Sequence, residues 1–148
     1  MANYGTIVDG DTYFASRLNA DAWDDATDAD KTKALTQSTR AIDLLNYLGE
    51  KTDEDQVNQF PRDDDSAVPD DIEYACYEES LSLLDGVVPE LEFENLSQVA
   101  QGYKNVRSTY DRSQLAQHIV AGIASVTAWR YIKPYLRDGN VVAIQRVS

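Results

Sequence analysis

The stretch TDADKTKALTQSTRAIDLLNYLG, residues 27–49, carries the strongest structural signal in this 148-residue chain. Its apolar and small residues recur every three or four positions, which predicts one buried face of an α-helix: Ala34, Leu35, Ser38, Ala41, Ile42, Leu45 and Leu48. Thr27 followed by Asp30 resembles a capping box, and Gly49 stands where a left-handed C-terminal cap is expected. We therefore predict a long helix from Asp28 to Leu48.

Weaker helical patterns lie on both sides of this segment. Asp11–Leu18 reads as a short helix with an apolar patch. A second long helix is predicted to begin at Asp70, after Pro69, and to stop at Asp85-Gly86. Pro89 is expected to prevent that helix from resuming.

The last third of the chain combines a helix with extended segments. Apolar residues at helical spacing predict a helix that begins at Leu115 and ends near Lys133, because Pro134 removes a backbone donor. Residues 96–100 and 105–110 resemble two short strands turned around Gly102. The fold class is therefore mainly α: a helical-bundle domain over residues 1–138, with a small β-hairpin at about 90–110 and an extended C-terminal arm, 139–148.

Charge is distributed unevenly along the chain, whose formal net charge is −13. Residues 1–100 hold 24 acids and 6 bases, a balance of −18, and residues 101–148 hold 2 acids and 7 bases, a balance of +5. The two parts either meet different surroundings or form an ordinary solvated surface. One Cys, no signal-peptide pattern and no membrane-spanning run together predict a soluble intracellular protein without a membrane partner.

No residue pattern supports catalysis, a cofactor or a metal. The acidic loop NQFPRDDDSAVPDD, residues 58–71, lacks the Gly and the terminal Glu of a calcium loop. Cys76 lies on an apolar helix face, where a free Cys is usually a small buried hydrophobe, and His118 is the only histidine. The chain shows no phosphate-cradling glycine pattern. We predict no catalytic, cofactor-binding or metal-binding residue and no enzymatic activity.

Single-stranded nucleic acid remains a candidate ligand. Proteins that bind it combine a basic groove with exposed stacking aromatics. Four of the nine tyrosines fall in the basic part of the chain: Tyr103, Tyr110, Tyr131 and Tyr135. Tyr131 and Tyr135 are four residues apart beside Trp129 and Ile132, which favours a core or subunit-contact stripe over a stacking surface.

An ordered set of residues resembles a family of head–tail connector, or adaptor, proteins of tailed bacteriophages. Members of this family are often labelled DnaT-like single-stranded-DNA-binding proteins. The resemblance covers residues 4–85 and continues weakly through Val106–Asp111 and Ile132–Arg137. It rests on this set: Tyr13-Phe14, Trp23, Lys33-Ala34-Leu35, Ile42-Asp43, Tyr47-Leu48-Gly49, Gln56, Phe60-Pro61-Arg62, Val68-Pro69 and Ala75.

The resemblance implies a structural virion protein located in the neck, between capsid and tail, and assembled in the host cytoplasm. Its homo-oligomer would be a dodecameric ring below the portal protein that extends the DNA channel. The ring would dock a tail-side neck or tail protein, with DNA only as passing cargo. The resemblance also implies that Gln56, Phe60, Pro61 and Arg62 form a structural joint, with Arg62 bonded to carboxylates or helix-end carbonyls. Apart from the weak match at Val106–Asp111, residues 86–130 match nothing in the family pattern.

Two functions from different classes therefore stay open. The first is the ring-forming adaptor, and the second is a single-stranded-nucleic-acid-binding accessory of replication or packaging. For the adaptor, the C-terminal arm is the predicted docking element, through Val141, Val142, Ile144 and Arg146. Its short apolar end is either a strand donated to a neighbour or a last strand packed on its own domain.

Overall fold

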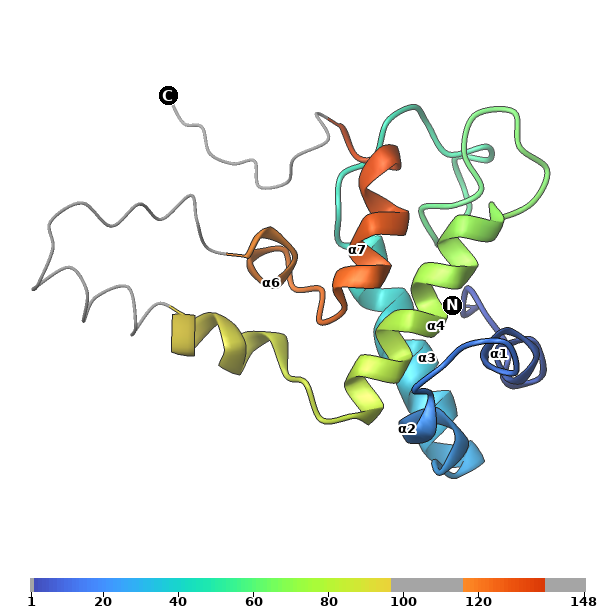
Figure 1. Ribbon diagram of the computed structural model, residues 1–148. Helices are drawn as coiled ribbons and strands as arrows, with labels where there is room; N and C mark the ends of the chain where they lie inside the picture. The colour runs from blue at the N-terminus through green and yellow to red at the C-terminus, as the bar shows by residue number, and fades with distance from the viewer. Residues whose placement is uncertain (1, 97–115, 138–148) are drawn as a thin grey trace, which may run out of the picture.

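A computed structural model of the chain describes residues 2–96 and 116–137, and within them the regular structure is helical (Figure 1). The only β-pairing in these residues consists of two isolated bridges, Tyr47 with Leu136 and Lys51 with Arg62. The mainly α prediction is confirmed for this part. The helices are α1 (Ile7–Phe14), α2 (Asp21–Asp24), α3 (Asp28–Asp43), α4 (Asp70–Leu84), α6 (Gln117–Val120), α7 (Val126–Ile132) and the 3-10 helix η2 (Lys133–Tyr135).

Helix α3 begins where the sequence predicts and ends five residues earlier. The Thr27 side chain accepts a hydrogen bond of 3.1 Å from the Asp30 backbone N–H, as expected of an N-cap. The predicted end at Leu48 is wrong because the chain after Asp43 bonds elsewhere. Leu48 N donates to the Tyr135 carbonyl of η2, and the Tyr47 hydroxyl donates to the Ile42 carbonyl.

Helix α4 forms the centre of the bundle, between α3 and α7 (Figure 1). Seven consecutive residues, 75–81, are buried, so neighbours cover it all round. Its end is a Schellman motif, because Gly86 N donates to Leu83 O and Val87 N donates to Ser82 O, each at 3.1 Å. Gly86 has φ 95°, which confirms the predicted stop at Asp85-Gly86.

The chain becomes helical again over residues 89–96, contrary to the sequence prediction. Pro89 was expected to block a helix, but it occupies the first helical position, where the missing N–H costs nothing. The predicted β element is therefore wrong over residues 90–96. The remainder of both predicted strands lies outside the described residues, as do residues 138–148 of the C-terminal arm.

The predicted helix from Leu115 is two helices. Gly122, with φ 87°, turns the chain between α6 and α7. Ser125 then caps α7, and its side chain accepts a 3.0 Å bond from Ala128 N. The predicted end is confirmed, since α7 stops at Ile132 and Pro134 lies in η2.

The N-terminal helix α1 lies four residues before its predicted position, because Thr6 caps it and accepts from Asp9 N. Trp23 of α2 is fully buried and packs on Phe14, with ring centroids 5.0 Å apart. The core combines these rings with the apolar faces of α3, α4 and α7.

Candidate functional site

The loop from α3 to α4 contains the four residues of the predicted joint. Gln56 closes the loop on itself. Its Nε2 donates to the carbonyls of Asn58 (3.0 Å) and Pro61 (2.8 Å), and its Oε1 accepts from Asp53 N (3.0 Å). Phe60 is 3% exposed, and its ring meets Tyr47 edge-on at 4.6 Å. The buried Phe60 ring therefore anchors the loop to the core.

Arg62 connects this loop to the end of α3. Only 8% of the residue is exposed. Its Nε donates to Leu48 O at 2.8 Å, its Nη2 to Gly49 O at 2.7 Å, and its Nη1 to Gln59 O at 3.1 Å. Guanidinium donors in a fixed fork suit such convergent acceptors. The acceptors include the carbonyls that follow α3, and no carboxylate bonds to this guanidinium in the described residues.

The three aspartates after Arg62 are exposed. Asp63 Oδ1 accepts from Glu50 N at 3.1 Å. Gly49 has φ 75°, and a Cβ there would lie 2.3 Å from the Asp63 carboxylate, so only glycine fits this turn. Within the part of the chain that the structure covers, no group of three or more His, Cys, Asp or Glu side chains is placed to hold a metal.

Cys76 is not placed as a nucleophile. It is fully buried between α3 and α4, and burial raises the pKa of its thiol to about 12. A thiol with that pKa stays protonated and inert at neutral pH. Its partners are Thr39 and the Leu35 carbonyl, whereas the His118 ring bonds the Ile123 carbonyl.

Two buried carboxylates on α4, Glu78 and Glu79, hold neighbouring elements in place, a role that the sequence does not predict. Glu78, 2% exposed, accepts from Arg17 through both oxygens at 2.9 Å and from the Tyr13 hydroxyl at 2.6 Å. Glu79, 1% exposed, accepts from Ala124 N at 2.8 Å and Ser125 N at 2.9 Å. Burial raises the pKa of Glu79 from 4.5 to about 7. The only signal in the sequence is that Glu79 falls at helical spacing with the apolar residues Ile72, Cys76 and Leu83.

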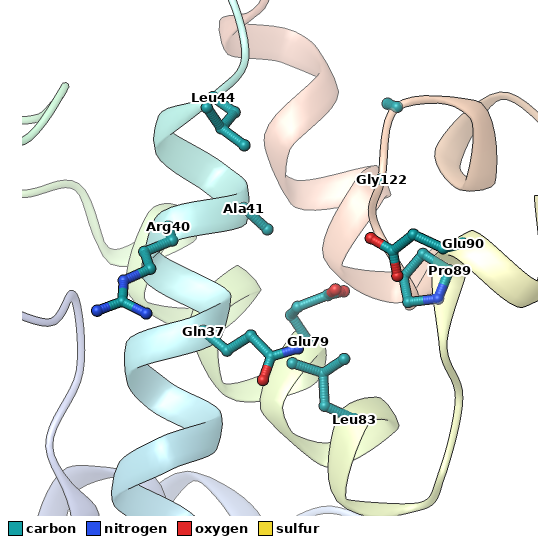
Figure 2. Close-up of a pocket in the computed structure, with 10 residues that line it drawn as sticks. Gln37, Arg40, Ala41, Leu44, Glu79, Leu83, Pro89, Glu90 and Gly122 are labelled. Carbon is teal, nitrogen blue, oxygen red and sulfur yellow. The ribbon is translucent and has the colours of Figure 1, made fainter.

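A pocket of about 220 Å³ lies between α3 and the turn before α7 (Figure 2). Ala41 and Glu79 face it, whereas the Arg40 guanidinium extends away from its centre. The Glu79 oxygens are already bonded to the Ala124 and Ser125 amides. The carboxylate thus fixes the start of α7, and no hydrogen bond joins it to the other polar side chains that line the pocket, Gln37, Arg40 and Glu90.

The described surface is acidic and lacks exposed aromatic side chains. Residues 2–96 and 116–137 hold 24 acidic and 9 basic side chains, a balance of −15. All of their Trp, Tyr and Phe side chains are buried or half-buried. Tyr131 packs on Tyr74, and Tyr135 meets Phe60 edge-on, so both belong to the core periphery as predicted. Tyr103 and Tyr110 lie outside the described residues.

The exposed bases of the second described segment lie close together in sequence, on α7 and η2 and just after η2. Arg130 and Lys133 are exposed, three residues apart, and exposed Arg137 follows η2. We call these three residues the basic stripe. Val126, 50% exposed, lies one turn before Arg130. Residues 116–137 contain no acid. The predicted docking residues Val141, Val142, Ile144 and Arg146 lie outside the described residues.

Residues 2–141 match the model of a family described as "Putative DnaT-like ssDNA binding protein". The chain belongs to this family. Searches of curated proteins and of solved structures found no significant match. Within the described residues, no helix is both long enough and apolar enough to cross a membrane.

Proposed function

We propose that this family member is a structural virion protein, a head-to-tail adaptor of a tailed bacteriophage. It would form a ring below the portal, extend the DNA channel and dock a tail-side protein. The observation that carries this proposal is the described surface, which has a charge balance of −15 and no exposed aromatic ring.

Such a surface suits a channel wall better than a DNA-binding groove. Affinity for nucleic acid comes mainly from cations that displace condensed counterions, and single strands also stack on exposed rings. Acidic side chains repeated around a ring would repel a passing polyanion. DNA would then move through without being gripped.

The resemblance of residues 4–85 to phage connector proteins supports the same function. Arg62, Phe60 and Gln56 serve the fold through buried contacts, which agrees with a joint between two helices. We infer no catalytic role, no metal and no cofactor for this protein.

A second candidate is a single-stranded-nucleic-acid-binding accessory protein, and the description of the family favours it. The basic stripe and the bases of residues 101–115 would then contact phosphates. On the adaptor proposal, the free protein binds neither single-stranded nor duplex DNA appreciably at about 150 mM salt.

Fluorescence anisotropy with a labelled oligothymidine separates the two functions. We expect no saturable signal at micromolar protein. Micromolar affinity that weakens steeply with added salt would favour the accessory protein instead, because log K falls by about 0.7 per tenfold salt for each phosphate neutralised on a single strand.

A further inference from the structure

We propose that the basic stripe of one copy docks on the acidic end of the next copy, which would make the ring contact head-to-tail. The acidic end is defined here as the exposed aspartates of α2 and the residues around it: Asp21, Asp24, Asp25, Asp28 and Asp30. This inference rests on the proposed ring-forming function and assigns the surfaces through which copies would meet.

The described bases divide into those that the fold uses and those that it leaves exposed. Four of the nine described bases serve the fold: Arg17 bonds Glu78, Lys31 bonds Asp11, Lys51 bonds the Gln56 carbonyl and Arg62 bonds the carbonyls described above. The ion pairs found among the described residues are Arg17–Glu78 and Lys31–Asp11, and neither involves the basic stripe. Three of the five exposed bases belong to the stripe, and none of their side chains is bonded to another described residue.

The basic stripe and the acidic end lie at different places on the molecule. The stripe lies on α7 and η2, whereas the acidic end lies on α2 and the start of α3, well apart at opposite ends of the bundle (Figure 1). Two complementary surfaces at different places on one chain give a heterologous contact, which closes into a ring or extends as a filament. A two-fold dimer would instead need one surface that complements itself.

A second copy of the chain suits the basic stripe better than a nucleic acid does. A polyanionic strand would need to approach a molecule with a net charge of −13 and would find no exposed aromatic ring on the described part. The acidic end of a second copy offers five exposed carboxylates close together in sequence, and Val126 adds an apolar edge to the contact. Complementary charges fix orientation as well as affinity. A second copy of this chain is therefore the occupant that we infer.

Charge reversal of each surface, with the full chain, tests the contact. The stripe variant carries Arg130→Glu and Lys133→Glu, and the end variant carries Asp24→Lys and Asp25→Lys. None of these four side chains makes a hydrogen bond in the described structure, so both variants should fold. The matched control, Lys33→Glu with Arg40→Glu, makes the same charge change on exposed positions of α3.

Sedimentation velocity at about 150 mM salt is the main measurement, because a Debye length of about 8 Å screens the overall repulsion but not a direct contact. We expect wild type and control to associate as concentration rises, and each reversed variant to associate at least about tenfold more weakly. Mixing the two variants should restore association, since the reversed stripe of one now fits the reversed end of the other. Coupling with a carbodiimide should also join Lys133 of one wild-type copy to an aspartate of another.

Several results would overturn the inference. The inference is wrong if both variants associate as strongly as wild type, or if the mixture of the two variants does not associate. It is also wrong if wild type does not associate and no Lys133 cross-link forms between copies. Loss of oligothymidine binding in the stripe variant would assign the stripe to nucleic acid. If wild type and the stripe variant form equal rings on a purified portal, this contact is wrong while the adaptor function stands. If wild type forms no ring there, the proposed function itself fails.

Discussion

At the scale of single residues, Arg62 and Asp64 are neighbours in the acidic loop with opposite roles. Arg62→Ala removes donors to three carbonyls and leaves acceptors such as Leu48 O without a partner. A hydrogen bond to a charged group is worth about 1.5–3 kcal/mol, so we expect a loss of at least that size in the free energy of unfolding. Asp64→Asn changes an exposed side chain and should stay within about 0.5 kcal/mol.

Urea denaturation of both variants measures the difference. Arg62→Lys is a matched control that keeps the charge and loses the forked geometry, so it should recover only part of the stability. Equal midpoints for Arg62→Ala and Asp64→Asn would show that this loop does not hold the end of α3.

Glu79 should give the unfolding free energy a distinct pH dependence. Its pKa is about 7 when folded and ordinarily 4.5, because burial disfavours the charged form. The folded state therefore binds the extra proton between pH 4.5 and 7, and stability falls as pH rises through this window. The contribution is about 3 kcal/mol, from 1.36 kcal/mol per pKa unit.

Glu79→Gln removes this titration. We expect the difference in unfolding free energy between the variant and wild type to shift by about 3 kcal/mol in favour of the variant from pH 5 to pH 8. Urea denaturation at both pH values measures this shift. If the unfolding free energies of the two proteins change in parallel with pH over that range, burial does not raise the pKa of Glu79.

At the scale of helices, the sequence predicts boundaries set by local interactions better than boundaries set by contacts with distant residues. Thr27 marks the start of α3 because a side-chain cap is a local interaction. The end of α3 depends on Tyr135, about 90 residues away, whose carbonyl accepts the Leu48 amide, and no local pattern carries that information. Similarly, the break between α6 and α7 depends on Glu79, which bonds the Ala124 and Ser125 amides.

The buried carboxylates mark a second limit of sequence reasoning. Glu78 and Glu79 are adjacent acids whose partners are not visible in the sequence, and acidic residues are rarely buried without partners. Their partners come from α1 and from the turn before α7, so their burial appears only once these elements are packed. The joint formed by Gln56, Phe60 and Arg62, in contrast, was placed from a resemblance rather than from a physical pattern.

The C-terminal arm, residues 139–148, is predicted to be needed for docking and not for folding. Removing residues 139–148 should leave a folded domain, because the core contacts of α7 and η2 lie before it. The truncated protein should no longer dock stably on its partner. Circular dichroism checks folding, and co-sedimentation with the portal checks docking. Unfolding, or docking as tight as that of the full chain, would remove the arm as the docking element.

At the scale of the whole molecule, charge should control assembly. A net charge of −13 makes copies repel one another at low salt, so we expect weak rings from the protein alone. A portal that holds several copies side by side raises their effective concentration and would stabilise the ring. Moderate salt should help by screening the repulsion.

Negative-stain imaging of the protein mixed with purified portal, at about 150 mM salt, tests the adaptor function most directly. The adaptor account predicts portal particles with an added ring of density on one face, which is absent from images of either component alone. Light scattering should report the matching increase in mass. A protein that stays strictly monomeric beside unchanged portal particles would contradict the account.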